Sequence, residues 1–376
     1  MTDRTVALTL EPYPLRKQES NLNRKPIQRR DFITTSGLAA AALAGLGRPS
    51  GLKAQAAAPT TGNLWPGRVA EVSNPSAVDS SGGLKSDQVR EMVDRAVLEL
   101  TGAKSVAEAW AKLLPGLGPH DAVGIKINVI NPKLPTHPEV VAAVVAGLKA
   151  IGVKENNILI WDRVGNGALG SFPKSGYTLN DGPAGARCLG TDHEKVGWDS
   201  QVKAQVPSVS LEFPVSRLAS EMVKYTINVP VLKDHGQPGI TYALKNYYGC
   251  IPLLDAPNLA KIRVPLMHTH HGNPQIAELY NNPVFRDKTR LHLGDALIIS
   301  HLNGPGGPPT AAAYTIHAST DPVALDALGL EIIDQKRKAS GLEPAAKRAG
   351  FIEAAAKLLL GQADRSQMDL RQVKLG

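Results

Sequence analysis

From residue 69 to the C-terminus, short apolar runs rich in β-branched residues alternate with segments that repeat apolar residues at helical spacing. The apolar runs are nearly continuous, as expected for strands that are covered on both faces. Strands that alternate with helices favour a largely parallel sheet, because each helix carries the chain back to the same edge. We therefore predict an α/β fold, with a mostly parallel central sheet and helices on both faces, in a single large domain over residues 69–376.

The two patterns locate the elements of this domain. The expected strands cover residues 69–72, 122–130, 157–162, 209–213, 225–232, 291–299, 314–318 and 368–375. The expected helices cover residues 86–101, 105–114, 137–152, 217–223, 240–248, 274–281, 322–337 and 344–360. Three segments lack periodicity and are predicted loops: 163–207, 251–273 and 302–310. The first is long for a connection, which indicates an insertion or an active-site flap.

Two of the expected helices begin with capping residues. Thr136 and Glu139 have the spacing of a capping box at the start of the third helix. Asp321 precedes Pro322, and Asp at the N-cap with Pro at the first helical position is typical of a helix start. We therefore expect Asp321 to cap the helix that follows it.

The N-terminal segment 1–56 has the order of an export signal. A basic, polar region ends in Arg29 and Arg30, and the apolar run 35–47 follows after Phe32. This order is similar to the twin-arginine signal. The similarity implies a protein that folds in the cytoplasm and reaches the periplasm through the twin-arginine translocase.

The apolar run of this segment is too short for a stable membrane span, which needs ~20 residues. Ala54, Gln55 and Ala56 form a small-residue cleavage site after the run. We predict cleavage near Ala56. Residues 57–68 are rich in Ala, Pro, Thr and Gly and are the predicted linker to the domain.

The formal net charge of +8 is concentrated in the predicted signal. Nine basic and four acidic residues lie within 1–56, so the rest of the chain carries a net charge of +3. Aromatic residues make up 5% of the chain, which leaves few side chains for stacking on bases. We therefore expect no nucleic-acid partner.

The chain has two cysteines, Cys188 and Cys250. Iron–sulfur clusters and zinc sites held by cysteine alone need four thiolates, so neither is expected. In an oxidising periplasm the two cysteines could form a disulfide, and the alternative is that each is a buried free thiol.

Lys126 and Asn128 are polar residues within the apolar strand VGIKINVINP. Residues two apart in a strand face the same side of the sheet. Ligands of open α/β sheets bind beyond the carboxyl ends of the strands, and a buried lysine is unfavourable without a partner. The pair therefore indicates either a binding site or a lysine that reaches solvent at the sheet edge.

A second group of polar residues lies in INVPVLKDHGQPGITYALKNYYGC. Lys233 and His235 end a strand, and Lys245 lies on the helix expected after it. Ammonium groups and a helix N-terminus favour an anionic ligand, and a histidine can move protons or bind a metal. The candidate catalytic residues are Lys126, Lys233, His235 and Lys245. The candidate ligand-binding residues are Asn128, Thr241 and Asn246.

Three histidines, His268, His270 and His271, lie within four residues of each other. Two of them are two positions apart and share one side of an extended segment, which suits a divalent transition metal. Short histidine-rich loops are also commonly solvated. Both interpretations stay open.

Five separated strings occur in the following order: VGIKINVINP, THPEVVAAVVAGLKAIG, NVPVLKDHGQPGITYALKNYYG, GDALI with NGPGG, and ASTDPVALDALG. Together they resemble the family called domain of unknown function 362, over residues 69–376. The resemblance implies that Lys126, Asn128, Lys233, His235, Lys245, Asn246 and Asp321 occupy family positions. Asp321 thereby joins the candidate ligand-binding residues. Many members carry a ferredoxin-like module, which this chain lacks, so no iron–sulfur cluster is expected.

We expect a periplasmic enzyme that acts on a small anionic molecule at the carboxyl ends of the strands, with metal assistance left open. The three lysines would hold the anion, and His235 would move protons or bind a metal. The alternative is a non-catalytic periplasmic protein that binds a metal or ligand through the three histidines.

Overall fold

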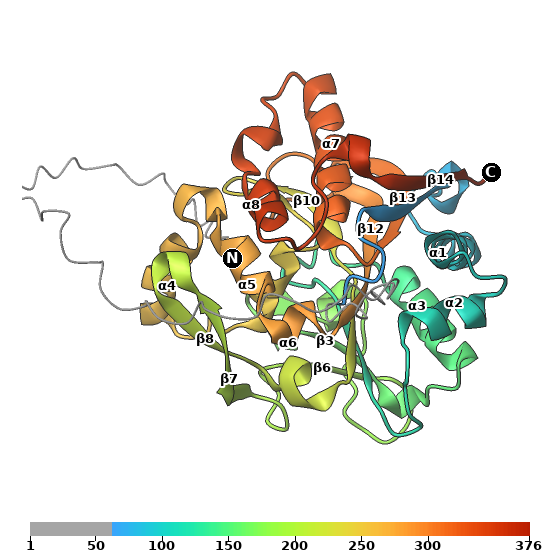
Figure 1. The fold of residues 1–376 in the computed structure, drawn as a ribbon, viewed down its shortest axis with the longest axis horizontal. Helices are drawn as coiled ribbons and strands as arrows, with labels where there is room; N and C mark the ends of the chain where they lie inside the picture. Colours follow the sequence, from blue (N-terminus) through green and yellow to red (C-terminus); the bar gives the residue numbers. More distant parts are fainter. Residues whose placement is uncertain (1–61) are drawn as a thin grey trace, which may run out of the picture. The chain divides into compact units, whose positions relative to one another are not determined.

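The computed structural model describes residues 62–376, which form one α/β unit (Figure 1). Ten strands make up one mixed sheet. In spatial order, eight of them are β14 (Asp369–Lys374), β1 (Arg68–Ser73), β13 (Ala311–Ser319), β12 (Thr289–Ser300), β9 (Tyr225–Asn228), β2 (Val123–Lys126), β3 (Ile158–Asp162) and β6 (Arg187–Gly190). The other two strands branch from β12: β10 (Val231–His235) pairs with β12, and β11 (Gly239–Thr241) pairs with β10. Six neighbouring pairs are parallel and three are antiparallel. The predicted mostly parallel sheet is confirmed.

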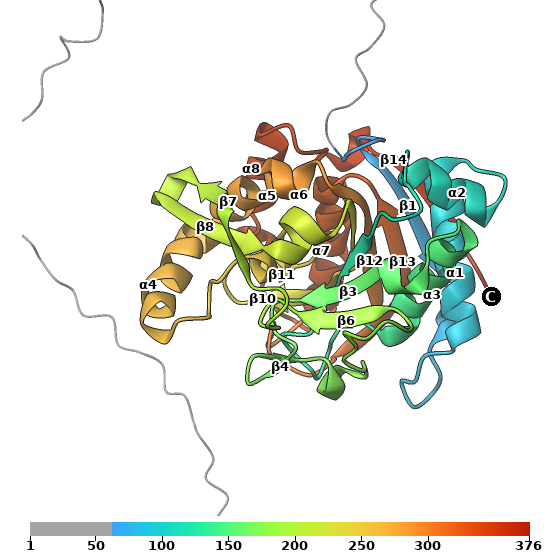
Figure 2. The same cartoon turned by 90° about the horizontal axis from the view of Figure 1, so that it is seen from below.

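Helices cover both faces of this sheet, as predicted (Figure 2). One face carries α1 (Ser86–Thr101), α2 (Val106–Leu113) and α3 (Pro138–Ala150). The other face carries α4 (Pro257–Met267), α5 (Gln275–Tyr280), α6 (Pro283–Arg286), α7 (Pro322–Ala339) and α8 (Phe351–Lys357). The molecule therefore has two hydrophobic cores with the sheet between them.

Strand β3 shows why the central strands are continuously apolar. Its residues are all buried, and they alternate between the two cores. Leu159 and Trp161 pack into the core beside α5 and α7, whereas Ile158 and Ile160 pack into the core beside α1 and α3. A strand buried on both faces needs an apolar residue at every position.

Helix α1 has the bounds that its apolar spacing predicts. Val89, Met92, Val93 and Ala96 are among its buried residues, and they recur every three or four positions. The helix ends at Gly102, which adopts φ 62° and donates its amide to the Leu98 carbonyl. A glycine accepts this left-handed conformation without the steric cost of a Cβ atom.

Two segments that were expected to be loops contain regular structure. Residues 163–207 include β6 and also β7 (Trp198–Val206), which pairs with β8 (Leu211–Ser216), and the short pair β4 (Asn166–Gly167) and β5 (Gly170–Ser171). Four consecutive residues of β7 are exposed, so this hairpin lacks the alternation that reveals a strand. Residues 251–273 contain α4. The segment 302–310 has no helix or strand, as predicted.

Two other predictions of secondary structure are wrong. The expected strand 225–232 is two strands, β9 and β10, because Pro230 between them has no amide hydrogen for the ladder. The expected helix 240–248 is instead β11 followed by the 3-10 helix η6 (Lys245–Cys250). The tight return after His235 pairs this segment back onto β10.

The predicted capping box at the start of α3 is also wrong. His137 is the N-cap residue and makes no side-chain cap. The Thr136 hydroxyl instead accepts from the Asn128 amide at 2.9 Å and donates to the Val229 carbonyl at 2.7 Å. It thus joins the chain after β2 to the chain after β9. The cap by Asp321 is confirmed, since its carboxylate accepts from the amides of Val323 and Ala324 at 2.9 Å.

The predicted signal, its cleavage site and the first part of the linker lie outside the described residues. Gly62 donates its amide to the Arg286 carbonyl, and Gly67 donates to the Asp321 carboxylate. The end of the predicted linker is therefore hydrogen-bonded to the domain. Within residues 62–376, no helix combines the length and the apolar character needed to cross a membrane.

Candidate functional site

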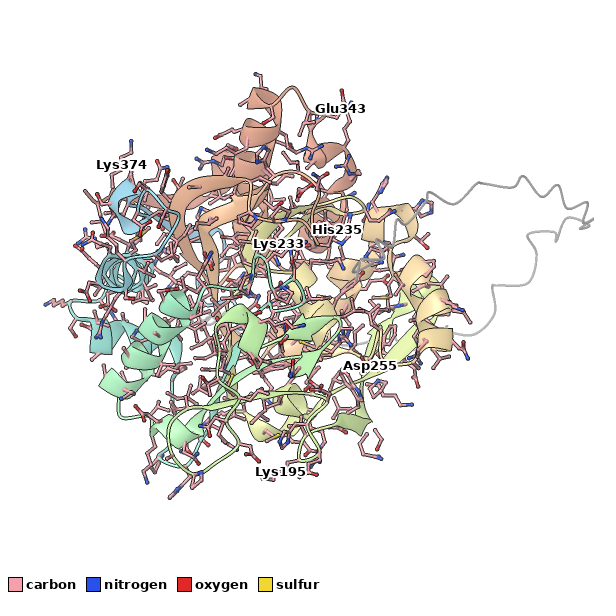
Figure 3. The ribbon with its side chains drawn as sticks, turned by 180° about the vertical axis from the view of Figure 1, so that it is seen from behind. Lys195, Lys233, His235, Asp255, Glu343 and Lys374 are labelled. Carbon is pink, nitrogen blue, oxygen red and sulfur yellow. The ribbon has the colours of Figure 1, made fainter. Side chains whose placement is uncertain are left out.

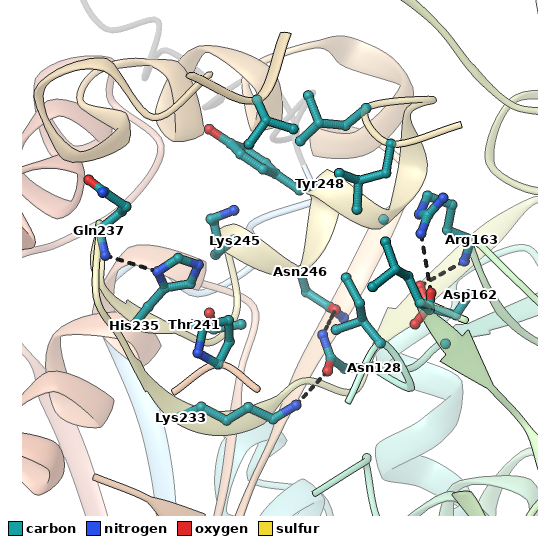
Figure 4. A pocket seen from close by; sticks show the side chains of 18 of the residues that line it. Asn128, Asp162, Arg163, Lys233, His235, Gln237, Thr241, Lys245, Asn246 and Tyr248 are labelled. Carbon is teal, nitrogen blue, oxygen red and sulfur yellow. Dashed lines mark hydrogen bonds between the residues drawn. The ribbon is translucent and has the colours of Figure 1, made fainter. Parts of the chain in front are cut away.

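A cavity of about 530 Å³ lies beyond the carboxyl ends of β2, β3 and β10. In the view of Figure 3, Lys233 and His235 lie near the middle of the molecule, whereas Lys195 and Lys374 lie at its periphery. The polar side chains that line the cavity are Asn128, Asp162, Arg163, Lys233, His235, Gln237, Thr241, Lys245 and Asn246 (Figure 4), together with His268. The apolar side chains that line it include Ile130, Val164, Leu169, Leu253, Leu254 and Val264.

Lys233 reaches the cavity from β10 and is fully buried. Its Nζ donates to the Asn128 Oδ1 at 2.8 Å, and within residues 62–376 no ion pair reaches it. Burial lowers the pKa of Lys233 to about 7, against the opposing negative charges of Asp162 and Asp295. Near neutral pH the amine is therefore divided between its charged and neutral forms.

Lys233 is held by a chain of hydrogen-bonded side-chain amides. Asn128 donates its Nδ2 to the Asn246 Oδ1 at 3.1 Å, and Asn246 donates to the Asn228 Oδ1 at 2.7 Å. A lysine can only donate, so its bond to the Asn128 oxygen sets the orientation of each amide that follows. The chain continues to His292, whose Nδ1 accepts from Asn228 at 3.0 Å and whose Nε2 lies 3.2 Å from the Tyr280 hydroxyl.

Lys245 enters the cavity from the first residue of η6. It is 8% exposed, and within residues 62–376 its Nζ has neither a hydrogen-bond partner nor an ion pair. The Nζ lies 3.4 Å from the centroid of the Tyr248 ring. Burial lowers the pKa of Lys245 well below its ordinary value.

His235 and His268 stack against each other in this cavity, with ring centroids 5.6 Å apart. The His235 Nδ1 accepts from the Gln237 amide at 3.1 Å, so the neutral ring carries its proton on Nε2. The His268 Nδ1 donates to the Val264 carbonyl at 2.8 Å, so the neutral ring has a free lone pair on Nε2. The pair thus offers one donor and one acceptor.

Both imidazoles are neutral over the physiological pH range. Burial and then the positive charge of Lys245 lower the pKa of His235 to about 2. The same two causes lower the pKa of His268 to about 4, although its bond to Val264 opposes them. Figure 4 shows the His235 ring between Gln237 and Lys245.

Thr241 adds a hydroxyl without a partner. It lies on β11 directly opposite Lys233, so both side chains are on the same face of the hairpin. The Thr241 Oγ1 is buried and has no hydrogen-bond partner within the described part of the chain. A buried hydroxyl without a partner is unfavourable, and a ligand in the cavity would satisfy it.

Lys126 is the one candidate catalytic residue that does not line the cavity. It is fully buried, and its Nζ donates to the Asp162 Oδ1 at 2.8 Å and to the Ile127 carbonyl at 2.7 Å. Asp162 also accepts from the Val129 amide at 2.8 Å. This ion pair joins the ends of β2 and β3, and its carboxylate, Asp162, lines the cavity.

Arg163, the residue after Asp162, also lines the cavity. It forms an ion pair with Asp255. Its Nη2 also donates to the Leu169 carbonyl at 3.2 Å. The pair joins the chain after β3 to the segment that leads into α4. Its cation is thus already neutralised, unlike the amines of Lys233 and Lys245.

Other predicted site residues lie elsewhere. The Asp321 carboxylate is fully buried at the start of α7, away from the cavity lining, and accepts from four backbone amides. His270 and His271 are exposed, whereas His268 lies in the cavity, so the structure does not bring the three histidines together. Within residues 62–376, no three His, Cys, Asp or Glu side chains are placed to hold a metal ion.

The two cysteines are buried free thiols in the structure. They lie in different hydrophobic cores, Cys188 on β6 and Cys250 at the end of η6. Burial raises the pKa of each thiol to about 12. Of the two alternatives from the sequence, the described structure therefore has the free thiols.

Sequence reasoning missed several residues of this site. Asn228 ends β9, as Asp162 ends β3, and a polar residue at the end of an apolar strand is the signal that could have found it. Tyr248 and Arg163 carry no such signal, because neither follows a pattern that distinguishes a site from a core or a surface. His268, one of the three histidines for which a metal site and a solvated loop both stayed open, stacks on His235.

The comparison with solved structures finds matches at low similarity. A structural-genomics protein from Thermotoga maritima is 13% identical with a TM-score of 0.35, and the match covers 69% of this chain and 60% of that one. The lactate racemase apoprotein from Thermoanaerobacterium thermosaccharolyticum is 15% identical with a TM-score of 0.37, and the match covers 70% and 57%. The chain thus matches about 60% of the length of these two structures.

The comparison with curated proteins finds no match. The family model described as Domain of unknown function (DUF362) matches residues 123–331, which contain every residue of the cavity. This range is more than half of the 376 residues and includes all five strings that suggested the family. The chain therefore belongs to the DUF362 family.

Proposed function

We propose that this protein is an enzyme that binds a small organic anion in the cavity beyond β2, β3 and β10. The observation that carries the proposal is a pair of buried lysines, Lys233 and Lys245, that share one cavity and have no carboxylate partner among residues 62–376. A buried amine without a counter-ion loses its proton, and an anion beside it reverses that loss. An anionic ligand would therefore gain two charge-assisted contacts that the free protein does not make.

Other features of the cavity fit a ligand of this kind. The Thr241 hydroxyl has no partner within residues 62–376, and it lies on the same face as Lys233. The cavity volume of about 530 Å³ is in the range of small-molecule sites. Its single arginine, Arg163, is already paired with Asp255, which leaves the lysines to receive the anion.

Catalysis, rather than binding alone, is supported by the histidine pair. His235 offers a proton on Nε2, and His268 offers a lone pair on Nε2. A reaction that moves a proton needs a donor and an acceptor in the same cavity. A binding protein would need no such pair.

The proposal is tested by thermal unfolding with acetate, pyruvate, benzoate and inorganic phosphate as probes. At ~100 times its dissociation constant, an anion that fits should stabilise the wild-type protein by several degrees. Lys233→Met and Lys245→Met should each remove most of that stabilisation. Lys195→Met, at a surface lysine, should keep it. Stabilisation that persists in both cavity variants, or that no probe produces, would contradict the proposal.

Anion binding should also be coupled to proton uptake. Because both lysines lose protons on burial, an anion that restores their charge must draw protons from the buffer. Calorimetric titration of the stabilising anion in two buffers of different ionisation enthalpy measures this uptake. Equal heats in the two buffers would argue against the lysines as the anion site.

We also propose that the protein works in the periplasm after export by the twin-arginine translocase. The support is the order of Arg29, Arg30, the apolar run 35–47 and the triplet 54–56. The double variant Arg29→Lys with Arg30→Lys should leave the full-length precursor in the cytoplasm, as cell fractionation measures. Normal export of this variant would refute the proposal.

A further inference from the structure

We infer that Lys245 is an amine nucleophile that forms an imine with an oxo acid, a carboxylate that also carries an aldehyde or ketone group. The inference rests on the proposed function, because it assumes that the cavity holds an organic anion. It assigns different tasks to the two cavity lysines: Lys233 binds the carboxylate, and Lys245 attacks the carbonyl carbon.

Lys245 has the surroundings that an amine nucleophile needs. Its Nζ lies over the Tyr248 ring, and no hydrogen bond or ion pair within residues 62–376 holds it as an ammonium. It is 92% buried and faces a cavity large enough for a small molecule. A lysine in an apolar pocket keeps the lone pair that a solvated ammonium lacks.

The neighbouring lysines differ from Lys245 in this respect. Lys126 is ion-paired to Asp162 and lies outside the cavity. Lys233 donates to the Asn128 oxygen at 2.8 Å, and that bond directs its remaining hydrogens toward the cavity. Lys233 is therefore suited to hold a carboxylate, together with the Thr241 hydroxyl opposite it.

The covalent step needs only the groups in the cavity. The Lys245 nitrogen lone pair attacks the carbonyl carbon, a C–N bond forms, and the C=O π pair moves to oxygen. His268, with its free Nε2, takes a proton from the nitrogen and passes it to the oxygen, which also accepts a hydrogen bond from the His235 Nε2–H. The nitrogen lone pair then forms the C=N bond as the C–O bond breaks, and the remaining nitrogen proton passes through His268 to the departing oxygen, which leaves as water. No oxidant or reductant is consumed.

The apolar side chains that line the cavity indicate the chemical character of the part of the substrate beyond its carboxylate and carbonyl groups. Ile130, Leu169, Leu254 and Val264 line the cavity together with the polar groups, and Leu169 is 52% exposed. These side chains would contact an apolar body attached to the oxo acid. Each additional methylene that is buried against them should improve affinity about fourfold, until the cavity is filled.

The test is reductive trapping on the full protein with sodium cyanoborohydride. The probes are pyruvate, 2-oxobutanoate and 2-oxohexanoate, and propanoate and hexanoate serve as controls without a carbonyl. Reduction of an imine adds the mass of the oxo acid less one oxygen atom. Peptide mapping of the wild-type protein should locate this addition at Lys245, at higher occupancy than at exposed lysines such as Lys195. The longer oxo acid should label at the lower concentration.

The outcomes separate this inference from the proposed function. Addition at Lys233, or equal addition across surface lysines that persists in Lys245→Met, overturns the assignment. Absence of a Lys245 adduct with all three oxo acids, while propanoate or hexanoate still stabilises the protein, overturns the inference and leaves the anion site standing. Loss of both signals contradicts both proposals. The mapping uses the wild-type protein, so the result does not depend on the folding of a variant.

Discussion

At the scale of single residues, three lysines of one region differ in what surrounds them. Lys126 is held by the Asp162 carboxylate, Lys233 by the Asn128 amide oxygen, and Lys245 lies over the Tyr248 ring. A carboxylate favours a cation most, an amide oxygen less, and burial without either favours the neutral amine. Residue type alone therefore does not distinguish a structural lysine from one that binds or reacts.

The ion pair of Lys126 should be structural. Replacing Lys126 by Met leaves the Asp162 carboxylate buried with its charge uncompensated, which should lower the free energy of unfolding by about 3–5 kcal/mol. Urea unfolding followed by circular dichroism measures this loss. The control Lys195→Met removes a pair with Asp181 at the surface and should change stability little. Similar effects of the two substitutions would contradict the structural role.

The pKa of Lys233 predicts a pH dependence of stability. Between about pH 7 and its ordinary pKa of 10.5, the unfolded chain holds a proton on Lys233 that the folded protein has lost. The free energy of unfolding contributed by this residue should therefore rise with pH in that window, by at most ~1.4 kcal/mol per pH unit. Urea unfolding of the wild type and of Lys233→Met across the window should show a difference that grows with pH. A constant difference would mean that the pKa of Lys233 is not lowered.

At the scale of elements, the ends of the strands position the site. Lys126, Asp162 and Asn228 each end one of three neighbouring parallel strands, so their side chains meet at one edge of the sheet. The segment after β10 then returns as β11 and η6 and brings Thr241, Lys245 and Asn246 over that edge. These positions come from four separate stretches of the chain between residues 126 and 246, and the fold gathers them.

The sequence was sufficient to predict the parallel sheet and most of the polar cluster, because both follow local patterns. Apolar runs identify strands, Lys233 and His235 lie where a strand ends, and Lys245 follows ten residues after His235. It was not sufficient for η6, since the pairing of β11 with β10 overrides a helical pattern. It was also not sufficient to pair His268 with His235, because only the fold of α4 and the turn after it brings that ring onto His235.

Gly249, within η6, is a sensitive point of this arrangement. A Cβ added there would lie 2.7 Å from the Asp162 Oδ1 and 2.9 Å from the Lys126 Nζ. Gly249→Ala should therefore push the ion pair away from η6 and lower the free energy of unfolding by about 1–3 kcal/mol. Gly236→Ala is the matched control, because its Cβ would meet nothing within 4 Å. Equal unfolding midpoints for the two variants in urea would show that η6 does not pack this tightly on the pair.

At the scale of the whole molecule, one sheet is shared by two cores. Strand β12 contributes Leu291, Leu293 and Leu297 to the core beside α1 and α3, and Ala296 and Ile299 to the core beside α5 and α7. Neither core can lose its packing without exposing one face of the same strands. The cavity lies at the edge of this sheet, so its geometry depends on both cores.

This coupling predicts cooperative unfolding. In native-state hydrogen exchange with increasing urea, amides of α1 on one face and of α7 on the other should converge on one free energy of opening, because the shared strands open once. The hairpin of β7 and β8, which has four consecutive exposed residues, should exchange through local opening at lower urea and serves as the internal reference. If α1 lost protection well before α7, or α7 before α1, the two cores would be independent units. The cavity would then lie between parts of unequal stability, and exchange in η6 would follow the weaker core.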